Sequence, residues 1–348
     1  LGVQEGMLGG PCVEVSRYIG EGQENKITVE LRAGNWGNKA EDFDSLPRTP
    51  TGDRDFTGRK GFNSRATGRI IKPWVISGGS AAEMFFSIGM WKPVRVELVP
   101  KVGLERPYLT TTRVQDNKAF LRFSAEVFAN SDQLKEKLHP THNTGIRHPR
   151  DKGYPFIPLR DKMSLRLEFK SAKGSFIKEI PLAIYEGRNW VDENIIIDNP
   201  AIWNPVGLGS PDLYTVCCTL KRNDSAVDKI DFDFGIRTIE RVPSAGPRLA
   251  DNWENWQFIV NGNAIFVKGM NFTPQDVLLE TNEQKYRWTL TAAKNMGVQL
   301  IRVWGGGLIE TDPFYKICNE LGLMVWQDFP IGNQNTPDYP QDVWEAQV

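Results

Sequence analysis

The sequence predicts β-sandwich domains followed by the first three strands of a parallel α/β barrel. Up to about residue 240, short runs alternate apolar and polar residues, which is the period of half-buried strands. From about residue 256, apolar strand-like runs alternate with helical patterns across short loops, which favours parallel strands joined by crossover helices. With 348 residues, the chain is long enough for two or three domains.

The first predicted unit, residues 1–100, is part of a β-sandwich. Alternating runs at 12–19, 25–33 and 91–100 predict its strands. The stretch 37–80 between them is polar and rich in Gly, Arg, Asp and Thr, so we expect a long loop inserted into the sandwich.

The second predicted unit, residues 101–241, is an immunoglobulin-like β-sandwich. Neighbouring Cys217 and Cys218 should point to opposite faces of one of its strands. The four cysteines, which include Cys12 and Cys318, have no Cys-x-x-Cys spacing, so they indicate neither a zinc site nor a disulfide framework. They leave the compartment open, with a secreted or periplasmic location as one option. The strands are predicted by alternating runs at residues 119–129, 163–170, 213–222 and 229–240.

A polar stretch at 131–155 interrupts this second unit and carries all three histidines, His139, His142 and His148. Two interpretations are open, a metal site and a solvated loop. We favour the loop and expect no metal, because no carboxylate or thiolate lies at ligand spacing from the histidines.

The third predicted unit, residues 242–348, is the N-terminal part of a parallel α/β barrel, the TIM-barrel fold. Asn261 and Gly262 predict a hairpin turn, and three buried strands follow, the second at 298–304 and the third at 323–329. A complete TIM barrel has eight strands and about 250 residues, so we expect most of it to be missing. The chain also starts without Met and stops inside a helix-like pattern, so we expect a fragment truncated at both ends.

Two helices are predicted between these three strands. The first begins at Thr281, whose hydroxyl can cap it together with Gln284, and Gly297 follows its end. The second has a complete set of end signals: Thr311 as its cap, Pro313 in its first turn and Gly322 past its end.

Side chains suited to binding follow each of these strands. Functional groups of a parallel barrel gather where its strands end. The first strand ends at Asn271, the second gives Arg302 and Trp304 before three glycines, and the third gives Trp326 and Asp328. These strand ends together present an amide, a guanidinium, indoles and a carboxylate, a set that suits a polyhydroxylated ligand. The glycines would let the backbone approach such a ligand closely.

Each of these residues also has a structural interpretation. Arg302 can be a charge that pairs with Asp328 and holds the barrel together, which would still shape the site. Trp326 fits a core position better than a binding position. The glycine triplet 305–307 can be a plain turn, so it is the conjunction of these groups that favours binding.

Composition excludes several other classes of protein. A net charge of −1 gives no reason to expect nucleic acid or an anionic membrane as a partner. No run approaches the roughly 18 apolar residues of a membrane-spanning helix. A dinucleotide enzyme is disfavoured because no Gly-x-Gly-x-x-Gly follows a first strand. The oligomeric state is not predicted.

Three motifs lie in the C-terminal part of the chain: FGIRTIE at 234–240, GNAIFVKGMNFTP at 262–274 and MGVQLIRVWGGGLIETDPFYKICNELGLMVWQDFP at 296–330. They strongly resemble the β-mannosidase branch of glycoside hydrolase family two. The resemblance is dense over residues 203–348 and patchy over residues 1–202, where 6–31 and 87–99 resemble strands of the family's sugar-binding jelly roll.

This resemblance implies a sugar-binding jelly roll in residues 1–100 and a TIM-barrel catalytic domain that begins at residue 242. It also implies that the protein is a retaining exo-β-glycosidase, which acts on terminal β-linked sugars of oligosaccharides or glycoconjugates. Such an enzyme needs no cofactor. Trp304 would be a sugar platform, and Asn271, Arg302 and Asp328 would line or support the pocket. Family members use two glutamates, after barrel strands four and seven, as acid/base and nucleophile. Both would lie beyond residue 348, so we expect no catalytic residue in this chain and interpret Glu310 as a binding or structural carboxylate.

One departure from the family pattern concerns the sugar. The branch carries a Trp-Asp segment in the jelly roll that reaches into the active site, whereas Trp74 here has no adjacent Asp. A β-galactosidase, β-glucuronidase or β-glucosaminidase therefore remains an alternative, as does a non-catalytic carbohydrate-binding protein.

Overall fold

The computed structural model describes residues 13–31, 90, 92–129, 161–247, 254–276 and 279–329. The predicted loop 37–80, Cys12, Trp74 and the three histidines lie outside these residues. No helix within the described ranges is long and apolar enough to cross a membrane.

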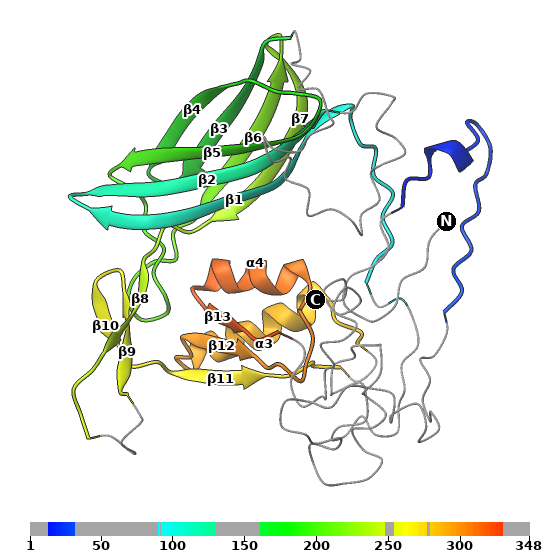
Figure 1. Ribbon diagram of the computed structural model, residues 1–348. Coiled ribbons are helices and arrows are strands. Elements are labelled where there is room, and N and C mark those ends of the chain that lie inside the picture. The colour runs from blue at the N-terminus through cyan, green and yellow to red at the C-terminus, as the bar shows by residue number, and fades with distance from the viewer. Residues whose placement is uncertain are drawn as a thin grey trace, which may run out of the picture.

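Two antiparallel sheets pack face to face in the middle of the chain (Figure 1). One has the strand order β1-β2-β5 and the other β4-β3-β6-β7. Phe123 of β2 and Phe169 of β3 are fully buried in the same apolar cluster, as alternation predicts. Cys218 is buried and Cys217 is partly exposed, which confirms their opposite orientation. The strands are β1 (Val102–Gln115), β2 (Lys118–Ala129), β3 (Met163–Ser171), β4 (Gly174–Leu182), β5 (Gly187–Asp198), β6 (Tyr214–Arg222) and β7 (Ser225–Phe234).

The strands predicted before residue 101 are wrong over the described residues. Residues 13–31 contain only a short 3₁₀ helix, η1 (Ser16–Tyr18), and residues 92–100 contain no strand. Val96 is 67% exposed and Leu98 is 99% exposed. Alternation supplies apolar residues for one face, but a strand also needs a hydrogen-bonded neighbour, and these segments pair with none among the described residues. The jelly roll over residues 1–100 stays a prediction.

The predicted run 229–240 is divided between two sheets. β7 ends at Phe234, and β8 (Ile239–Pro243) pairs with β9 (Trp256–Val260), which pairs with β10 (Asn263–Ile265). Gly235 lies in the crossing, where a Cβ would be 2.7 Å from Cγ of Trp203. Strand β8 spans the predicted domain boundary between residues 241 and 242.

The hairpin turn predicted at Asn261 and Gly262 joins β9 to β10. Their φ angles are 49° and 78°. Positive φ at both central residues is what a type I′ turn requires, so this prediction is confirmed.

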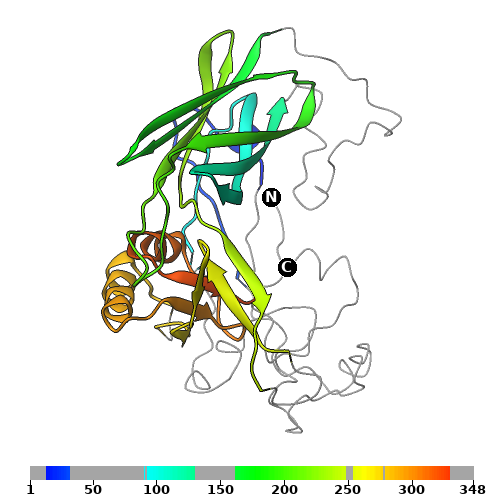
Figure 2. The ribbon, with the colours of Figure 1, turned by 90° about the vertical axis from the view of Figure 1, so that its left-hand side faces the viewer.

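A three-stranded parallel sheet follows, in the order β11 (Gly269–Phe272), β12 (Leu300–Val303) and β13 (Met324–Gln327). Helices α3 (Glu283–Asn295) and α4 (Asp312–Leu321) connect the strands and lie on one side of the sheet (Figures 1 and 2). The predicted β-α-β-α-β order is confirmed. The strands were expected to be buried, but their burial is largely confined to the face that packs against the helices.

The ends of the two helices follow their sequence signals with one exception. α3 begins after Asn282, whose side chain accepts a hydrogen bond from the amide of Lys285, so Thr281 is not its cap. Asn caps a helix at least as well as Thr, and it lies one residue closer to the first helical residue. Thr311 is the N-cap of α4, and Gly322 ends it with a φ of 79°.

Trp203 joins the sandwich to the parallel sheet. Its side chain is fully buried, and its Nε1–H donates a hydrogen bond to the carbonyl of Asn319 in α4 at 2.8 Å. The guanidinium of Arg237 lies over the ring, 4.7 Å from its centroid. Close by, the amide of Val206 donates to the carbonyl of Gly322 at 2.9 Å. The loop after β5 is therefore fixed to the C-terminal end of α4.

We expect Trp203→Phe to lower the free energy of unfolding by about 2 kcal/mol, because it removes ring volume and leaves the Asn319 carbonyl without this donor. Urea denaturation followed by circular dichroism measures the change. Trp288→Phe is the matched control, since that indole is 76% exposed, and it should alter stability by less than about 0.5 kcal/mol. Equal stability of the two variants would show that Trp203 does not hold this junction.

Candidate functional site

The parallel sheet has one face against the helices and one open face. Side chains alternate along each strand, so Ile301 and Val303 of β12 pack against α3 and α4. Asn271, Arg302 and Trp326 lie on the other face. The strand register pairs Asn271 with Arg302 and Arg302 with Trp326. An amide, a guanidinium and an indole therefore form one row across three strands.

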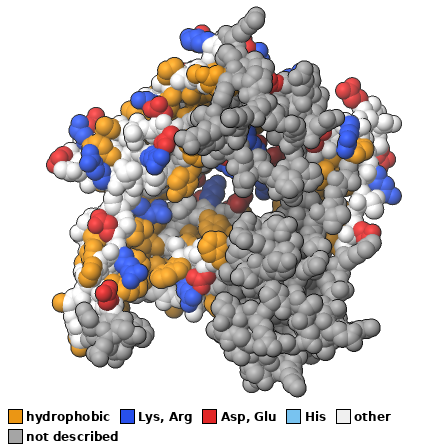
Figure 3. Space-filling view, viewed as in Figure 1, with side chains coloured by type: hydrophobic (Ala, Val, Ile, Leu, Met, Phe, Trp, Pro, Cys, Tyr) orange, Lys and Arg blue, Asp and Glu red, His pale blue; other side chains and the backbone are white. Residues whose placement is uncertain are grey.

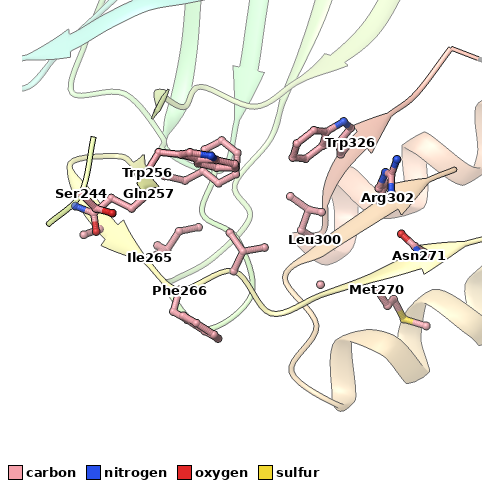
Figure 4. Close-up of a pocket in the computed structure, with 14 residues that line it drawn as sticks. Ser244, Trp256, Gln257, Ile265, Phe266, Met270, Asn271, Leu300, Arg302 and Trp326 are labelled. Atoms are coloured by element: carbon pink, nitrogen blue, oxygen red, sulfur yellow. The ribbon is translucent and has the colours of Figure 1, made fainter. Parts of the chain in front are cut away.

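A hollow of about 830 Å³ lies over this open face. Its lining combines the row on the parallel sheet with aromatic side chains from the β9–β10 hairpin, and Figure 4 shows Trp256 and Trp326 on opposite sides of it. Figure 3 shows hydrophobic side chains gathered over the lower left of the molecule, where β8–β11 lie in Figure 1. Aromatic walls with a few convergent polar groups are typical of small-molecule sites.

Sequence reasoning missed the aromatic residues of the hairpin. Trp256 and Phe258 of β9 stack edge to face with centroids 5.0 Å apart, and Phe258 meets Trp326 in the same way at 6.5 Å. Trp326, interpreted from the sequence as core, is 45% exposed and lines the hollow. The i, i+2 spacing of Trp256 and Phe258 was the available signal, because it places both rings on one face of a strand.

Asp328 fixes the orientation of Arg302. Its Oδ2 accepts a hydrogen bond from Nη2 of Arg302 at 2.6 Å, and Oδ1 lies 3.4 Å from Nε. The same carboxylate accepts the amide N–H of Gly305 at 3.2 Å. The ion pair predicted as a structural alternative is thus present, and it also holds the guanidinium of the row in one place.

The three glycines are close to atoms of the protein itself. A Cβ at Gly305 would lie 2.9 Å from the carbonyl oxygen of Phe329, and one at Gly306 would lie 2.4 Å from the indole of Trp304. The amide of Gly307 donates to the carbonyl of Trp304 at 2.8 Å, which closes a tight turn. The turn therefore needs glycines in order to pack under Trp304 and beside β13.

The four predicted site residues do not all meet in the hollow. Asn271 and Arg302 line it, and Asp328 supports Arg302. Trp304 is half-buried with its indole over Gly306, and it is not among the lining residues. The role of these four residues toward a ligand remains a proposal.

Glu310 is a buried carboxyl group just beyond the glycine turn. It is 5% exposed, and the hydroxyl of Tyr286 donates a hydrogen bond to its Oε2. Burial raises the pKa of Glu310, although the Tyr286 hydrogen bond and the charge of Lys92 act against this. Burial, followed by the contact with Glu310, raises the pKa of Tyr286 to about 12. For both groups, burial therefore favours the uncharged form.

Within the part of the chain that the structure describes, no group of three or more His, Cys, Asp or Glu side chains could hold a metal ion. His139, His142 and His148 lie outside that part. The expectation of no metal at the histidine-rich stretch therefore stays a prediction.

Comparison with known proteins gives the class to which this architecture is related. Residues 161–237, which include β3 to β7 and so contribute strands to both sandwich sheets, match the family model of Glycosyl hydrolases family 2. Among curated relatives, β-mannosidase B of Aspergillus terreus is 36% identical over 178 residues, which cover 49% of this chain and 21% of the relative. β-Mannosidase B of Aspergillus niger is 37% identical over 169 residues, 48% of this chain and 19% of the relative.

Solved structures agree with this class. The β-D-mannosidase from Dictyoglomus thermophilum matches with a TM-score of 0.53 and 28% identity, over 66% of this chain and 24% of that protein. A complex of the Amycolatopsis orientalis exo-chitosanase matches with a TM-score of 0.50 and 19% identity, over 71% of this chain and 26% of that protein, a likeness of fold alone.

The resemblance inferred from the motifs is confirmed: the chain is similar to β-mannosidases, and residues 161–237 match the model of glycosyl hydrolases family 2. It spans about one fifth of the length of the two curated relatives.

We expect Asp328→Asn to lower the free energy of unfolding by about 1–2 kcal/mol, because Arg302 and the Gly305 amide both lose a charged acceptor. Chemical denaturation measures this. Asp224→Asn is the matched control, since Asp224 forms an exposed ion pair with Lys162 at 3.3 Å that should contribute little. A loss no larger than that of the control would mean that Asp328 does not hold the turn.

Proposed function

We propose that the chain is part of a retaining exo-β-glycosidase that removes terminal β-linked mannose from oligosaccharides or glycoconjugates. The observation that carries the proposal is the row of Asn271, Arg302 and Trp326 beside a hollow with aromatic walls. The similarity to β-mannosidases of two Aspergillus species and of Dictyoglomus thermophilum supports the choice of substrate.

The chemistry of a sugar ring accounts for the groups in this row. Hydroxyls of a pyranose donate and accept hydrogen bonds, which an amide can match in both directions and a guanidinium can match as a donor. The flat apolar face of the ring packs against an indole. Because Asp328 already fixes Arg302, little side-chain entropy would be lost when a sugar binds.

The proposal assigns binding rather than bond cleavage to these residues. Retaining hydrolysis needs a carboxylic acid to protonate the leaving oxygen and a carboxylate, about 5–5.5 Å away, to attack the anomeric carbon. We propose that both carboxyl groups belong to parts of the complete protein beyond residue 348. Asn271, Arg302, Trp304 and Asp328 would then hold and orient the terminal sugar.

The full-length protein should hydrolyse a nitrophenyl β-mannoside in a panel of nitrophenyl β-glycosides. Hydrolysis of a galactoside, glucuronide or glucosaminide instead would keep the glycosidase and replace its sugar. If the full-length protein folds but hydrolyses none of these glycosides, the enzymatic proposal is contradicted. The function would then be carbohydrate binding.

In that full-length enzyme, Trp304→Ala should lower kcat/KM at least ~10-fold, which is about 1.4 kcal/mol of transition-state binding. The physical reason is loss of the aromatic surface proposed to contact the sugar. Trp288→Ala, on the exposed side of α3, is the control and should leave kcat/KM unchanged. If both variants keep full activity, Trp304 has a packing role only.

A further inference from the structure

The loop that carries Trp304 is held at both ends by carboxyl groups. We call residues 304–311 the glycine loop. At its start, Asp328 accepts the amide of Gly305 at 3.2 Å. At its end, Glu310 accepts the hydroxyl of Tyr286, which belongs to α3. The first contact belongs to the proposed binding site, whereas the second lies behind it and has no assigned role.

The surroundings of Glu310 provide a single hydrogen bond for a buried carboxyl group. Its Oε1 is buried and has no hydrogen-bond partner in the described structure. Tyr286 is itself fully buried and packs edge to face on Phe314, with centroids 5.5 Å apart. An ionised carboxylate in such a place would need several donors, whereas an uncharged acid tolerates it better.

We infer that Glu310 is a positioning residue for Trp304 and that it acts as the uncharged acid, hydrogen-bonded to Tyr286. This inference rests on the proposed function, because Trp304 is a sugar platform only in that proposal. Glu310 touches no substrate in this account. It fixes the far end of the glycine loop to α3, and the loop transmits that constraint to the indole.

The glycine loop is short and tightly packed enough to transmit the constraint. Gly307 donates its amide to the carbonyl of Trp304 at 2.8 Å, and a Cβ at Gly307 would lie 3.2 Å from Cδ of Pro274. Leu308 is 3% exposed. Packing at Gly307 and Leu308 therefore connects the Glu310 end of the loop to Trp304.

Charged and titratable groups face Glu310 from three directions. Tyr286 approaches from α3, Tyr315 from α4 and Lys92 from the segment before β1. Tyr286 and Lys92 favour the ionised carboxylate, and burial outweighs them, so the pKa of Glu310 is raised. Because the folded state then holds the proton more tightly, the stabilising effect is full at low pH and is lost as the pH rises through the folded-state pKa.

The test is a double-mutant cycle in the full-length enzyme. Glu310→Ala should lower kcat/KM about 10-fold in the wild-type background and less than about 3-fold in the Trp304→Ala background, because residues that act through one another are not additive. Glu310→Gln, which keeps the acceptor for Tyr286, should retain activity at low pH and lose less of it than wild type as the pH rises. Glu283→Ala, on the exposed face of α3, is the control.

Two results would overturn the inference. Additive losses in the cycle would mean that Glu310 does not act through Trp304. A Glu310→Gln variant as impaired as Glu310→Ala at low pH would mean that the charged carboxylate is required.

If the full-length protein hydrolyses no glycoside, two readouts that need no activity still decide the matter. Hydrogen exchange of the Gly305–Leu308 amides should accelerate in Glu310→Ala and stay at the wild-type rate in Glu310→Gln. The melting temperature of Glu310→Gln should match wild type at low pH and exceed it increasingly as the pH rises. Unchanged hydrogen exchange in Glu310→Ala would overturn the inference independently of the proposed function. So would a difference in melting temperature between Glu310→Gln and wild type that does not depend on pH.

Discussion

The parallel register of β11, β12 and β13 is the constraint on which the candidate site depends. Pairing of Asn271 with Arg302 and of Arg302 with Trp326 places three chemically different groups in one row. Because side chains alternate between the two faces of a strand, the intervening apolar residues point toward α3 and α4. The same register therefore builds both the core and the open face. A shift of one residue in β12 would exchange Arg302 for Ile301 or Val303 and destroy both.

Two carboxyl groups, those of Asp328 and Glu310, then hold the Arg302 side chain and the glycine loop in place. Asp328 ties the guanidinium of Arg302 to the start of the glycine loop, and Glu310 ties the end of that loop to α3. Glycines are required at these positions because a Cβ would clash with the protein's own atoms, above all with the indole of Trp304 at Gly306. Their conformational cost is therefore explained by local packing, and the proposed sugar contacts are an additional use of the same turn.

The sequence alone predicted those parts whose signals are local. Period-two runs predicted β2, β3, β6 and β7 of the sandwich but not β1, β4 and β5, and Thr311 and Gly322 marked the ends of α4. Asn282 is the cap of α3 in place of Thr281, because both residue types cap helices and Asn does so at least as well as Thr. Residues 92–100 alternate without forming a strand, since pairing depends on a neighbour that the segment itself does not encode. The i, i+2 spacing of Trp256 and Phe258 indicates that their rings share one face, but only the tertiary fold brings Phe258 against Trp326.

We propose that the row on the parallel sheet and the glycine loop beside it hold a terminal β-linked sugar. A crystal structure of the full-length protein with a bound β-mannoside is the decisive experiment. We expect a sugar ring with hydroxyls within hydrogen-bonding distance of Asn271, Arg302 or Asp328 and one face against an indole of Trp304 or Trp326. A sugar bound elsewhere, with protein side chains filling the space over Arg302, would contradict it.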